Sequence, residues 1–379
     1  MIDKYSEAQR TKDSRESCVP SLASGSDSLT LFTEGDDLYD VMLASIAAAQ
    51  QSVRLESYIF ADDEIGWRFA EALGERARSG VDVRLHLDAA GSLFWSSRRL
   101  ERHLRRQGVK VRWFHRWNWR RPWRYNCRNH RKLLVLDAKE AYLGGFNIHR
   151  ENSRKVYGEA RWRDTHLGLK EALAAQTADL FDAFWNGHWR GGAPQIPVDN
   201  SVLMSNHSRR ARRQLRYLYG EFFKGARRSL YLTTPYFVPD RRTQRNIINA
   251  ARRGLDVRLL VPRKSDMRLV RWATQAAYAN LLRAGVRIYE YLPRMLHAKT
   301  AVSDRTFAIV GTSNLDYRSF FVNYELNLFS RDAELSSRLE DQFMKDLDEG
   351  EEISPGRWAH RGWSGHFSES IGWIARRWL

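Results

Sequence analysis

Cysteines and long apolar segments are both scarce in this sequence. Cys18 and Cys127 are the only cysteines among 379 residues, which excludes a disulfide framework and indicates a reducing compartment. The first 28 residues lack the apolar core of a secretory signal, and we expect them to form a disordered tail. No uninterrupted apolar run is long enough to cross a bilayer, so we expect no signal peptide and no transmembrane segment.

Acidic residues are outnumbered by basic ones. The chain has 62 Lys and Arg residues against 45 Asp and Glu residues, a formal net charge of +17. An excess of this size predicts an anionic partner, either nucleic acid or an acidic membrane surface. The 14 Trp residues favour the membrane–water interface, although the same rings would serve for stacking on single-stranded nucleic acid.

One short pattern occurs twice. "HRKLLVLD" and "HAKTAVSD" share the form H-x-K-x4-D, and each is followed after six residues by G-x-x-N. A single H-x-K on a strand is compatible with a structural His and Lys at a strand edge, but two copies with the same downstream offset indicate a true repeat. The pattern gives six candidate catalytic residues and two candidate phosphate-binding residues: His130, Lys132, Asp137, His297, Lys299 and Asp304, with Asn147 and Asn314.

The repeat extends upstream of both motifs and predicts the fold. "SVRLESYIFADD" resembles "SLYLTTPYFVPD", and each is followed by a helical stretch that ends in Gly before an apolar strand, at 81–87 and 257–261. Alternating strands and helices predict an α/β fold of two α/β/α lobes related by a pseudo-twofold axis, each with a mixed sheet, and an active site in the cleft between them. We divide the chain into a tail (1–28), a first lobe (29–190), a linker (191–200), a second lobe (201–350) and a basic-aromatic amphipathic tail (351–379).

A histidine from each lobe suits the chemistry of a phosphodiester. One neutral imidazole can attack phosphorus while the other, protonated, gives its proton to the leaving alcohol. Lysines and Asn amides can stabilise the charge on the phosphate oxygens without a metal. The two motif aspartates, at the far ends of their strands, are expected to hold a turn rather than to touch the histidines.

An imidazole held in one tautomer needs an acceptor on its other nitrogen. Each half offers one downstream carboxylate, Asp164 in "WRDTHLGL" and Glu325 in "NYELNLFS". Both interrupt apolar strand-like stretches, where an unpaired charge is costly. The alternative is a salt bridge to a nearby arginine such as Arg163 or Arg318.

These motifs resemble the phospholipase D superfamily, and "TPYFVPD" and "GTSNLDYRSFFVNYELNL" resemble bacterial cardiolipin synthases. The hydrophobic N-terminal hairpin of the longer synthases is not present, so the chain is most similar to the shorter cardiolipin synthase B group. The resemblance implies a phosphatidyl-histidine intermediate, no cofactor or metal, His130 as nucleophile and His297 as acid and base. In the segment after the first motif, His149 and Arg150 stand where an acidic residue or Gly is more usual in the family. This departure bears on the pocket for the acceptor alcohol.

Two segments are candidates for contact with a membrane. The stretch "RWFHRWNWRRPWRYNCRNHRK" combines cations with Trp and has no acid, and the C-terminal tail has apolar residues at helical spacing. The alternatives are a partly buried loop with Arg–Trp stacking and a tail helix that docks on the second lobe. The candidate contact residues are Arg112, Trp113, Trp117, Trp119, Arg120, Arg121, Trp123, Trp373 and Trp378.

The function that we predict is a phosphatidyltransferase, peripheral on the bacterial inner membrane, that makes cardiolipin from two molecules of phosphatidylglycerol and releases glycerol. No obligate protein partner is expected, since both motifs lie in one chain. The alternatives are a phosphodiesterase that acts as a phospholipase D hydrolase or as a nuclease, and a catalytically idle membrane- or nucleic-acid-binding protein.

Overall fold

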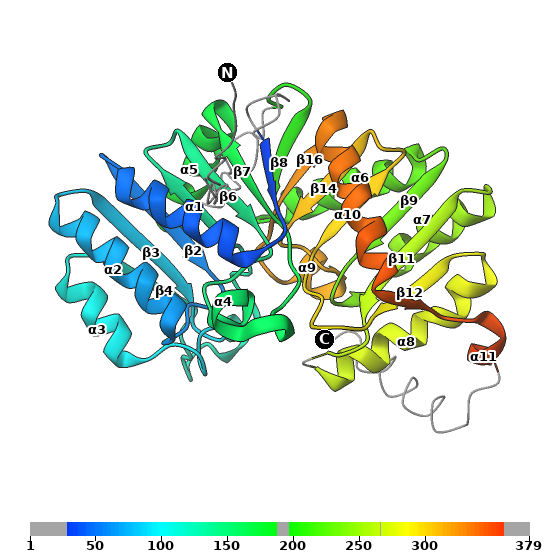
Figure 1. The fold of residues 1–379 in the computed structure, drawn as a ribbon, viewed down its shortest axis with the longest axis horizontal. Coiled ribbons are helices and arrows are strands. Elements are labelled where there is room, and N and C mark those ends of the chain that lie inside the picture. Colours follow the sequence, from blue (N-terminus) through cyan, green and yellow to red (C-terminus); the bar gives the residue numbers. More distant parts are fainter. Residues whose placement is uncertain (1–28, 188–196, 266, 360–379) are drawn as a thin grey trace, which may run out of the picture.

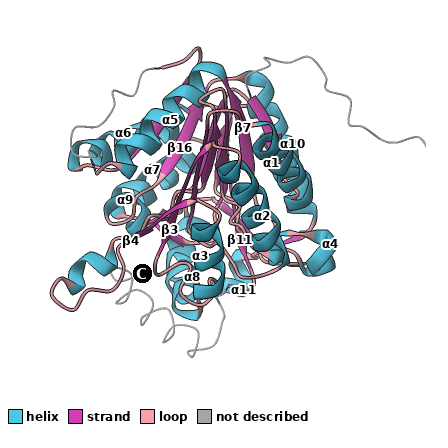
Figure 2. Ribbon diagram, turned by 90° about the vertical axis from the view of Figure 1, so that its left-hand side faces the viewer, coloured by secondary structure: helices cyan, strands magenta, loops and turns pink. Residues whose placement is uncertain are grey.

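The fold repeats one arrangement of strands and helices in two lobes, which lie side by side (Figure 1). The computed structural model describes residues 29–187, 197–265 and 267–359. The tail at 1–28 and most of the predicted linker therefore lie outside the described residues. Figure 2 shows the strands enclosed between helices on both sides, which is the α/β architecture that the repeat predicted.

The first lobe is built on a seven-stranded mixed sheet. In sheet order its strands are β1 (Leu29–Phe32), β7 (His166–Lys170), β6 (Glu140–Gly144), β5 (Leu133–Leu136), β2 (Ser52–Ser57), β3 (Asp82–Asp88) and β4 (Lys110–Phe114). β2, β3 and β4 are parallel, and the other neighbours are antiparallel. Its helices are α1 (Gly35–Ala48), α2 (Glu64–Arg78), α3 (Arg98–Arg106), α4 (Arg154–Tyr157) and α5 (Glu171–Trp185), with 3-10 turns η1 (Pro122–Asn126), η2 (Arg150–Asn152) and η3 (Gly158–Ala160).

The second lobe repeats this layout in an eight-stranded sheet. In sheet order its strands are β17 (Gly350–Glu352), β12 (Arg287–Tyr291), β11 (Asp256–Pro262), β9 (Ser229–Thr233), β13 (Thr300–Ser303), β14 (Phe307–Gly311), β16 (Leu326–Ser330) and β8 (Ser201–Ser205). A separate pair joins β10 (Phe237–Val238) to β15 (Leu315–Asp316). Its helices are α6 (Arg209–Gly225), α7 (Arg241–Arg252), α8 (Arg268–Arg283), α9 (Tyr317–Phe321), α10 (Ala333–Asp348) and α11 (Pro355–Ala359).

Local sequence signals account for the repeated helices. Asp63 caps the start of α2 by accepting from the Gly66 amide, and Asp240 caps α7 in the same way. Both helices are followed by a glycine with positive φ, Gly80 and Gly254, where a side chain would be strained. The strands predicted at 81–87 and 257–261 correspond to β3 and β11 within one residue.

Apolar packing joins the lobes as well as filling them. One buried cluster contains Leu167 of β7 in the first lobe together with Val310 and Leu328 of the second. The second lobe also extends beyond residue 350, because β17 pairs with β12 and Trp358 of α11 packs 4.9 Å from Tyr278. The boundary predicted at 350 is therefore placed too early.

Candidate active site

Each catalytic candidate histidine is held by the backbone of the opposite lobe. His130 precedes β5, and its amide donates to the Tyr324 carbonyl at 2.9 Å. His297 precedes β13, and its amide donates to the Arg163 carbonyl at 2.7 Å. These contacts bring both histidine segments to the same edge of the molecule, beside the loops that carry Asp164 and Glu325.

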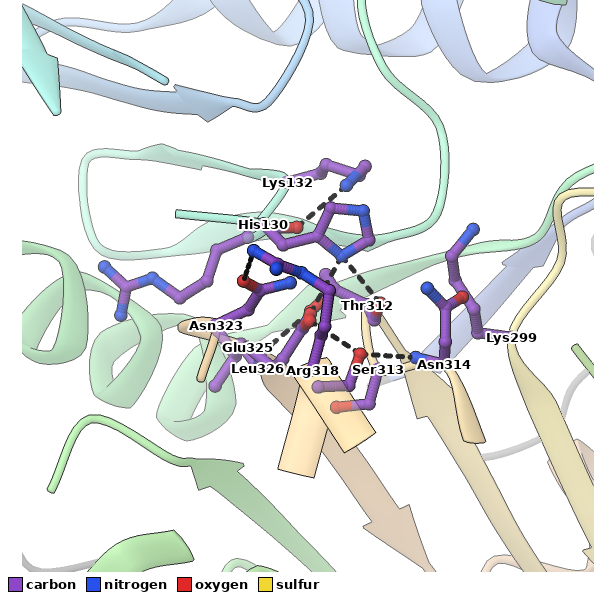
Figure 3. A network of polar contacts seen from close by, with 12 residues as sticks. His130, Lys132, Lys299, Thr312, Ser313, Asn314, Arg318, Asn323, Glu325 and Leu326 are labelled. Atoms are coloured by element: carbon purple, nitrogen blue, oxygen red, sulfur yellow. Dashed lines mark hydrogen bonds and ion pairs between the residues drawn. The ribbon is translucent and has the colours of Figure 1, made fainter. Parts of the chain in front are cut away.

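The carboxylate that orients His130 comes from the second lobe. His130 Nδ1 lies 3.0 Å from Glu325 Oε2 and 3.1 Å from the Thr312 carbonyl (Figure 3). Ser319 Oγ donates to the other Glu325 oxygen at 2.9 Å, so the carboxylate is fixed by its own lobe. With Nδ1 as the donor, Nε2 is left unprotonated and nucleophilic.

The carboxylate that orients His297 comes from the first lobe. Asp164 Oδ2 lies 2.5 Å from His297 Nδ1, and Asp164 is wholly buried. Burial alone raises the pKa of Asp164, but the charge of Lys299 and the contact with His297 hold it below the usual value. The two histidine–carboxylate pairs are thus exchanged between the lobes.

A difference between the two motifs matches the difference in carboxylate length. A Cβ on Gly145 would come within 1.9 Å of Asp164 Oδ1, so the shorter acid approaches a bare backbone there. The corresponding residue of the second motif is Thr312, whose hydroxyl donates to Glu325 Oε2 at 2.5 Å. The sequences "GGFN" and "GTSN" therefore each accommodate their own acid.

The alternative of a salt bridge from Asp164 or Glu325 to a nearby arginine is wrong. Arg163 pairs with Asp346 instead, with nitrogen–oxygen distances of 3.0 and 2.8 Å. Arg318 donates to the side chain of Asn126 at 2.9 Å. Neither arginine forms a salt bridge to Asp164 or Glu325 among the residues that the structure describes.

Both motif lysines are buried beside the histidines. Lys132 Nζ donates to the His130 carbonyl at 2.8 Å, and Lys299 Nζ lies 2.9 Å from His297 Nδ1. Burial, and then the charge of Lys299, lowers the pKa of Lys132 to about 7. Two mutually repelling cations in a buried site favour an anion as their common partner.

The same environment keeps both imidazoles neutral. Burial lowers the pKa of His130 below its usual value, although the charge of Glu325 opposes the shift. Burial, and then Lys299, lowers the pKa of His297 to about 3. Lys132 and Lys299 each lower the pKa of the other lobe's histidine as well, so the four groups form one electrostatic unit.

The two asparagines lie in comparable places but are held differently. Asn147 Oδ1 accepts from the Ile59 amide at 3.1 Å, which leaves the amide nitrogen to donate elsewhere. Asn314 lies beside Lys299 (Figure 3), and its buried Oδ1 has no hydrogen-bond partner among the described residues. Both are more than nine-tenths buried, as a phosphate-binding amide would be.

The motif aspartates do not reach the histidines. Asp137 accepts from the amides of Gln50, Gln51 and Ser52 at 2.8, 2.8 and 2.7 Å, at the opposite end of β5 from His130. Asp304 does the same for Arg227, Arg228 and Ser229 in the second lobe. Inclusion of these aspartates in the catalytic set is therefore corrected, and the structural interpretation fits their contacts.

Aromatic rings close to the histidines were missing from the candidate set. The Tyr58 ring lies 4.9 Å from the His130 ring, and Lys132 Nζ lies 5.1 Å from the Tyr58 ring. The Trp162 ring lies 5.3 Å from His297. The signal for Tyr58 was present, since an aromatic residue follows the strand in both halves of the repeat.

Two of the membrane-contact candidates belong to the body of the first lobe. Arg112 of β4 is exposed, although its guanidinium stacks 4.5 Å from the Trp185 ring, and Trp113 packs half-buried against the first-lobe core. Trp117 and Trp119 are 65% and 75% exposed, and Arg120 and Arg121 are exposed too. The side chain of Trp123, and all of Trp373 and Trp378, lie outside the described residues.

No helix in 29–187, 197–265 or 267–359 is long and apolar enough to cross a membrane. Within the same ranges, no group of three or more His, Cys, Asp or Glu side chains could hold a metal ion.

Comparison with known proteins gives the family. A family model described as "Cardiolipin synthase, PLD-like domain" matches residues 42–185 and 219–347. A cardiolipin synthase of Clostridium perfringens is 33% identical over 84% of this chain and 70% of its own length. One from Staphylococcus aureus is 32% identical over 90% of this chain and 72% of its own length.

Solved structures show the same fold. A phosphatidylserine synthase of Haemophilus influenzae superposes with a TM-score of 0.71 at 13% identity, covering 93% of this chain and 95% of its own. A polyphosphate kinase of Porphyromonas gingivalis gives 0.60 at 15% identity, over 86% of this chain and 49% of its own. The sequence relatives, the doubled motif and this fold agree: the chain belongs to the cardiolipin synthase family and is an enzyme of the phospholipase D superfamily.

Proposed function

We propose that this chain is a phosphatidyltransferase that forms cardiolipin from two molecules of phosphatidylglycerol and releases glycerol. The observation that carries the proposal is the pair of exchanged contacts, His130 with Glu325 and His297 with Asp164, beside two buried lysines. Such a centre offers a nucleophile, an acid and a cationic phosphate site from one chain. The relatives named cardiolipin synthase support the same substrate class.

The first half-reaction transfers a phosphatidyl group to the protein. His130 Nε2 attacks the phosphorus of phosphatidylglycerol, a P–N bond forms, and the P–O bond to the headgroup glycerol breaks. His297 gives its proton to the glycerol oxygen that leaves. Glu325 stabilises the positive charge that develops on the His130 imidazole, as a buried acid does for a triad base.

The second half-reaction reverses these roles. A hydroxyl of a second phosphatidylglycerol attacks the same phosphorus while His297, now neutral, takes its proton. The P–N bond breaks and cardiolipin leaves with His130 restored. One phosphodiester is made for each that is broken, so the exchange needs no external energy source.

Substrate entry prepares His297 to act as an acid. In the empty site Lys299 contributes to the low pKa of His297. A phosphodiester anion between the lysines offsets their charge and so raises the pKa of His297, while Asp164 stabilises the imidazolium. Protonation is thereby linked to the presence of substrate.

We place the enzyme at the surface of the bacterial inner membrane, where its lipid substrates reside. The formal charge of +17 suits an anionic lipid surface. The same charge is the observation that favours a nuclease as the second candidate.

The test is lipid mass spectrometry of purified protein incubated with phosphatidylglycerol vesicles, beside His130→Ala and His297→Ala. We expect cardiolipin and glycerol from the wild type and neither from the variants. Phosphatidic acid alone would identify a hydrolase. Cleavage of a labelled oligonucleotide that disappears in His130→Ala, without a lipid product, would identify a nuclease.

A further inference from the structure

Large apolar side chains are exposed on several loops that follow parallel strands. Phe94, in the loop after β3, is 92% exposed, and Trp119, after β4, is 75% exposed. In the second lobe Met267, after β11, is 46% exposed. With their neighbours they make up a set that we call the apolar rim: Leu93, Phe94, Trp117, Trp119, Met267, Leu269 and Leu292.

The apolar rim shares an edge with the active site. β3 and β4 run parallel to β2. Near the C-terminal end of β2, Glu56 pairs with Leu133, which comes just after Lys132. β11 and β12 run parallel to β9, where Thr233 pairs with Thr300, just after Lys299. The loops beyond these strands therefore leave the molecule at the edge where both catalytic candidate histidines lie.

Basic side chains accompany parts of the apolar rim in both lobes. Arg120, Arg121 and Arg124 are exposed in the loop at 115–127, which contains no acidic residue. Lys264 and Arg268 are exposed next to Met267 in the second lobe. Exposed apolar side chains with cations beside them match the chemistry of an anionic bilayer, whose headgroups attract the cations while its acyl region accepts the apolar groups.

We propose that the apolar rim inserts into the interface of an anionic lipid bilayer and seats the paired histidines against the headgroups. The proposal rests on the proposed function, because it names the surface through which that same site meets its lipid. Both lobes contribute, so the bilayer would be held on both sides of the site and a lipid phosphate would reach the lysines without leaving the membrane.

The composition of the rim favours a bilayer over nucleic acid. Stacking on bases needs aromatic rings, but Leu93, Leu269 and Leu292 are aliphatic. Aliphatic side chains gain by entering an acyl region and gain little on a base. Binding to nucleic acid is thus the competing outcome of the test.

The test measures cosedimentation of the full chain with vesicles of phosphatidylglycerol and of phosphatidylcholine. The double variant Phe94→Ser/Trp119→Ser removes two rim side chains that the body does not need. Its matched control is Val41→Ser/Tyr217→Ser, which removes apolar side chains that are 40% and 54% exposed on α1 and α6, away from the loops of the rim.

We expect the rim variant to bind phosphatidylglycerol vesicles at least about tenfold more weakly than the wild type, because two large side chains no longer enter the interface. The control variant should bind like the wild type. Cleavage of a soluble short-chain phosphodiester should be equal in all three proteins, since the histidines are untouched.

Equal vesicle binding by the rim and control variants would overturn the proposal. So would release of the wild type from vesicles by a single-stranded oligonucleotide at equimolar phosphate. A wild type that binds vesicles through the rim and yet makes no cardiolipin would support the docking surface while overturning the proposed function.

Discussion

At the scale of single residues, the site is organised by burial of charge. His130, Lys132, His297 and Lys299 are each less than a tenth exposed, and Asp164 and Glu325 are fully buried. Unpaired, such charges would be costly, and here each histidine is paired with a carboxylate, while Lys299 Nζ also lies 4.0 Å from Asp164 Oδ2. The two lysines thus balance the two carboxylates, and a phosphodiester anion would give the lysines a further partner.

This balance predicts a specific pH dependence. Lys132 binds an anion only when protonated, and its pKa is lowered to about 7, so kcat/KM should fall as the pH rises through about 7. A bound anion raises the pKa of Lys132, so kcat should begin to fall at a higher pH than kcat/KM does. Because the pKa of His130 is lowered, the acid limb should lie below its ordinary value of about 6.5.

The measurement is a pH profile of cardiolipin formation from phosphatidylglycerol in mixed micelles, with micelle binding followed at each pH as a control. A kcat/KM that stays constant from neutral to alkaline pH, with unchanged micelle binding, would contradict a lysine poised near neutrality.

The sequence was most informative about residues that repeat. Spacing alone singled out both histidines, both lysines and both asparagines as candidates, and the structure brings all of them to one edge of the molecule. Spacing could not show which carboxylate serves which histidine, because that depends on how the lobes pack. Tyr58 and Trp162 were missed for a similar reason, since an aromatic residue near a strand end looks the same in a core and in a site.

At the scale of elements, the motif aspartates fasten strands. The Asp137 carboxylate accepts hydrogen bonds from three backbone amides at the start of β2, and the Asp304 carboxylate accepts three at the start of β9. Both residues have positive φ in the turn that follows the motif strand. These contacts explain why the spacing from His to Asp repeats although the Asp does not touch the His.

We expect Asp137→Asn and Asp304→Asn each to lower the free energy of unfolding by roughly 1–3 kcal/mol, because an amide cannot accept three charge-assisted hydrogen bonds. Chemical denaturation at neutral pH measures this. Asp341→Asn, which removes an exposed partner of Arg305, should change it by less than about 0.5 kcal/mol.

The loss of stability in Asp137→Asn and Asp304→Asn should itself depend on pH. Backbone amides hold the pKa of both aspartates below the usual value in the folded protein, against the effect of burial. Their contribution is therefore present above the unfolded pKa of about 3.9 and is lost as the pH falls through the folded value. A loss of stability in Asp137→Asn that persisted at strongly acid pH would show that the charge is not its cause.

Sequence patterns predicted β3 and β11 within one residue because apolar runs and Gly caps are local signals. They could not show that Trp113 lies half-buried on β4 against the lobe, or that Arg112, although exposed, stacks on Trp185. Whether an Arg–Trp pair faces solvent or a neighbouring helix is decided by tertiary packing.

At the scale of the whole molecule, the lobes share a core and a site. Leu167, Val310 and Leu328 belong to one buried cluster across the lobes, and Arg163 forms a buried ion pair with Asp346 of the other lobe. Interfaces that are large and apolar couple the stabilities of the parts that they join.

We therefore expect one cooperative unfolding transition for the full chain, shifted alike by Asp137→Asn in the first lobe and Asp304→Asn in the second. Tryptophan fluorescence and far-ultraviolet circular dichroism should report the same midpoint. Two transitions, of which each variant moves only the one of its own lobe, would contradict a shared core.

The central claim is that two exchanged histidine–carboxylate pairs form one transferring centre. It is tested most directly by the rate at which deuterated glycerol exchanges into phosphatidylglycerol, a reaction that the two half-reactions allow without a second lipid. We expect Glu325→Gln and Asp164→Asn each to slow this exchange by roughly 10²–10⁴-fold with the fold retained, as loss of the orienting acid does in a triad. Glu340→Gln, on α10 away from the histidines, should exchange at the wild-type rate. Exchange at the wild-type rate in either of the first two variants would contradict the account.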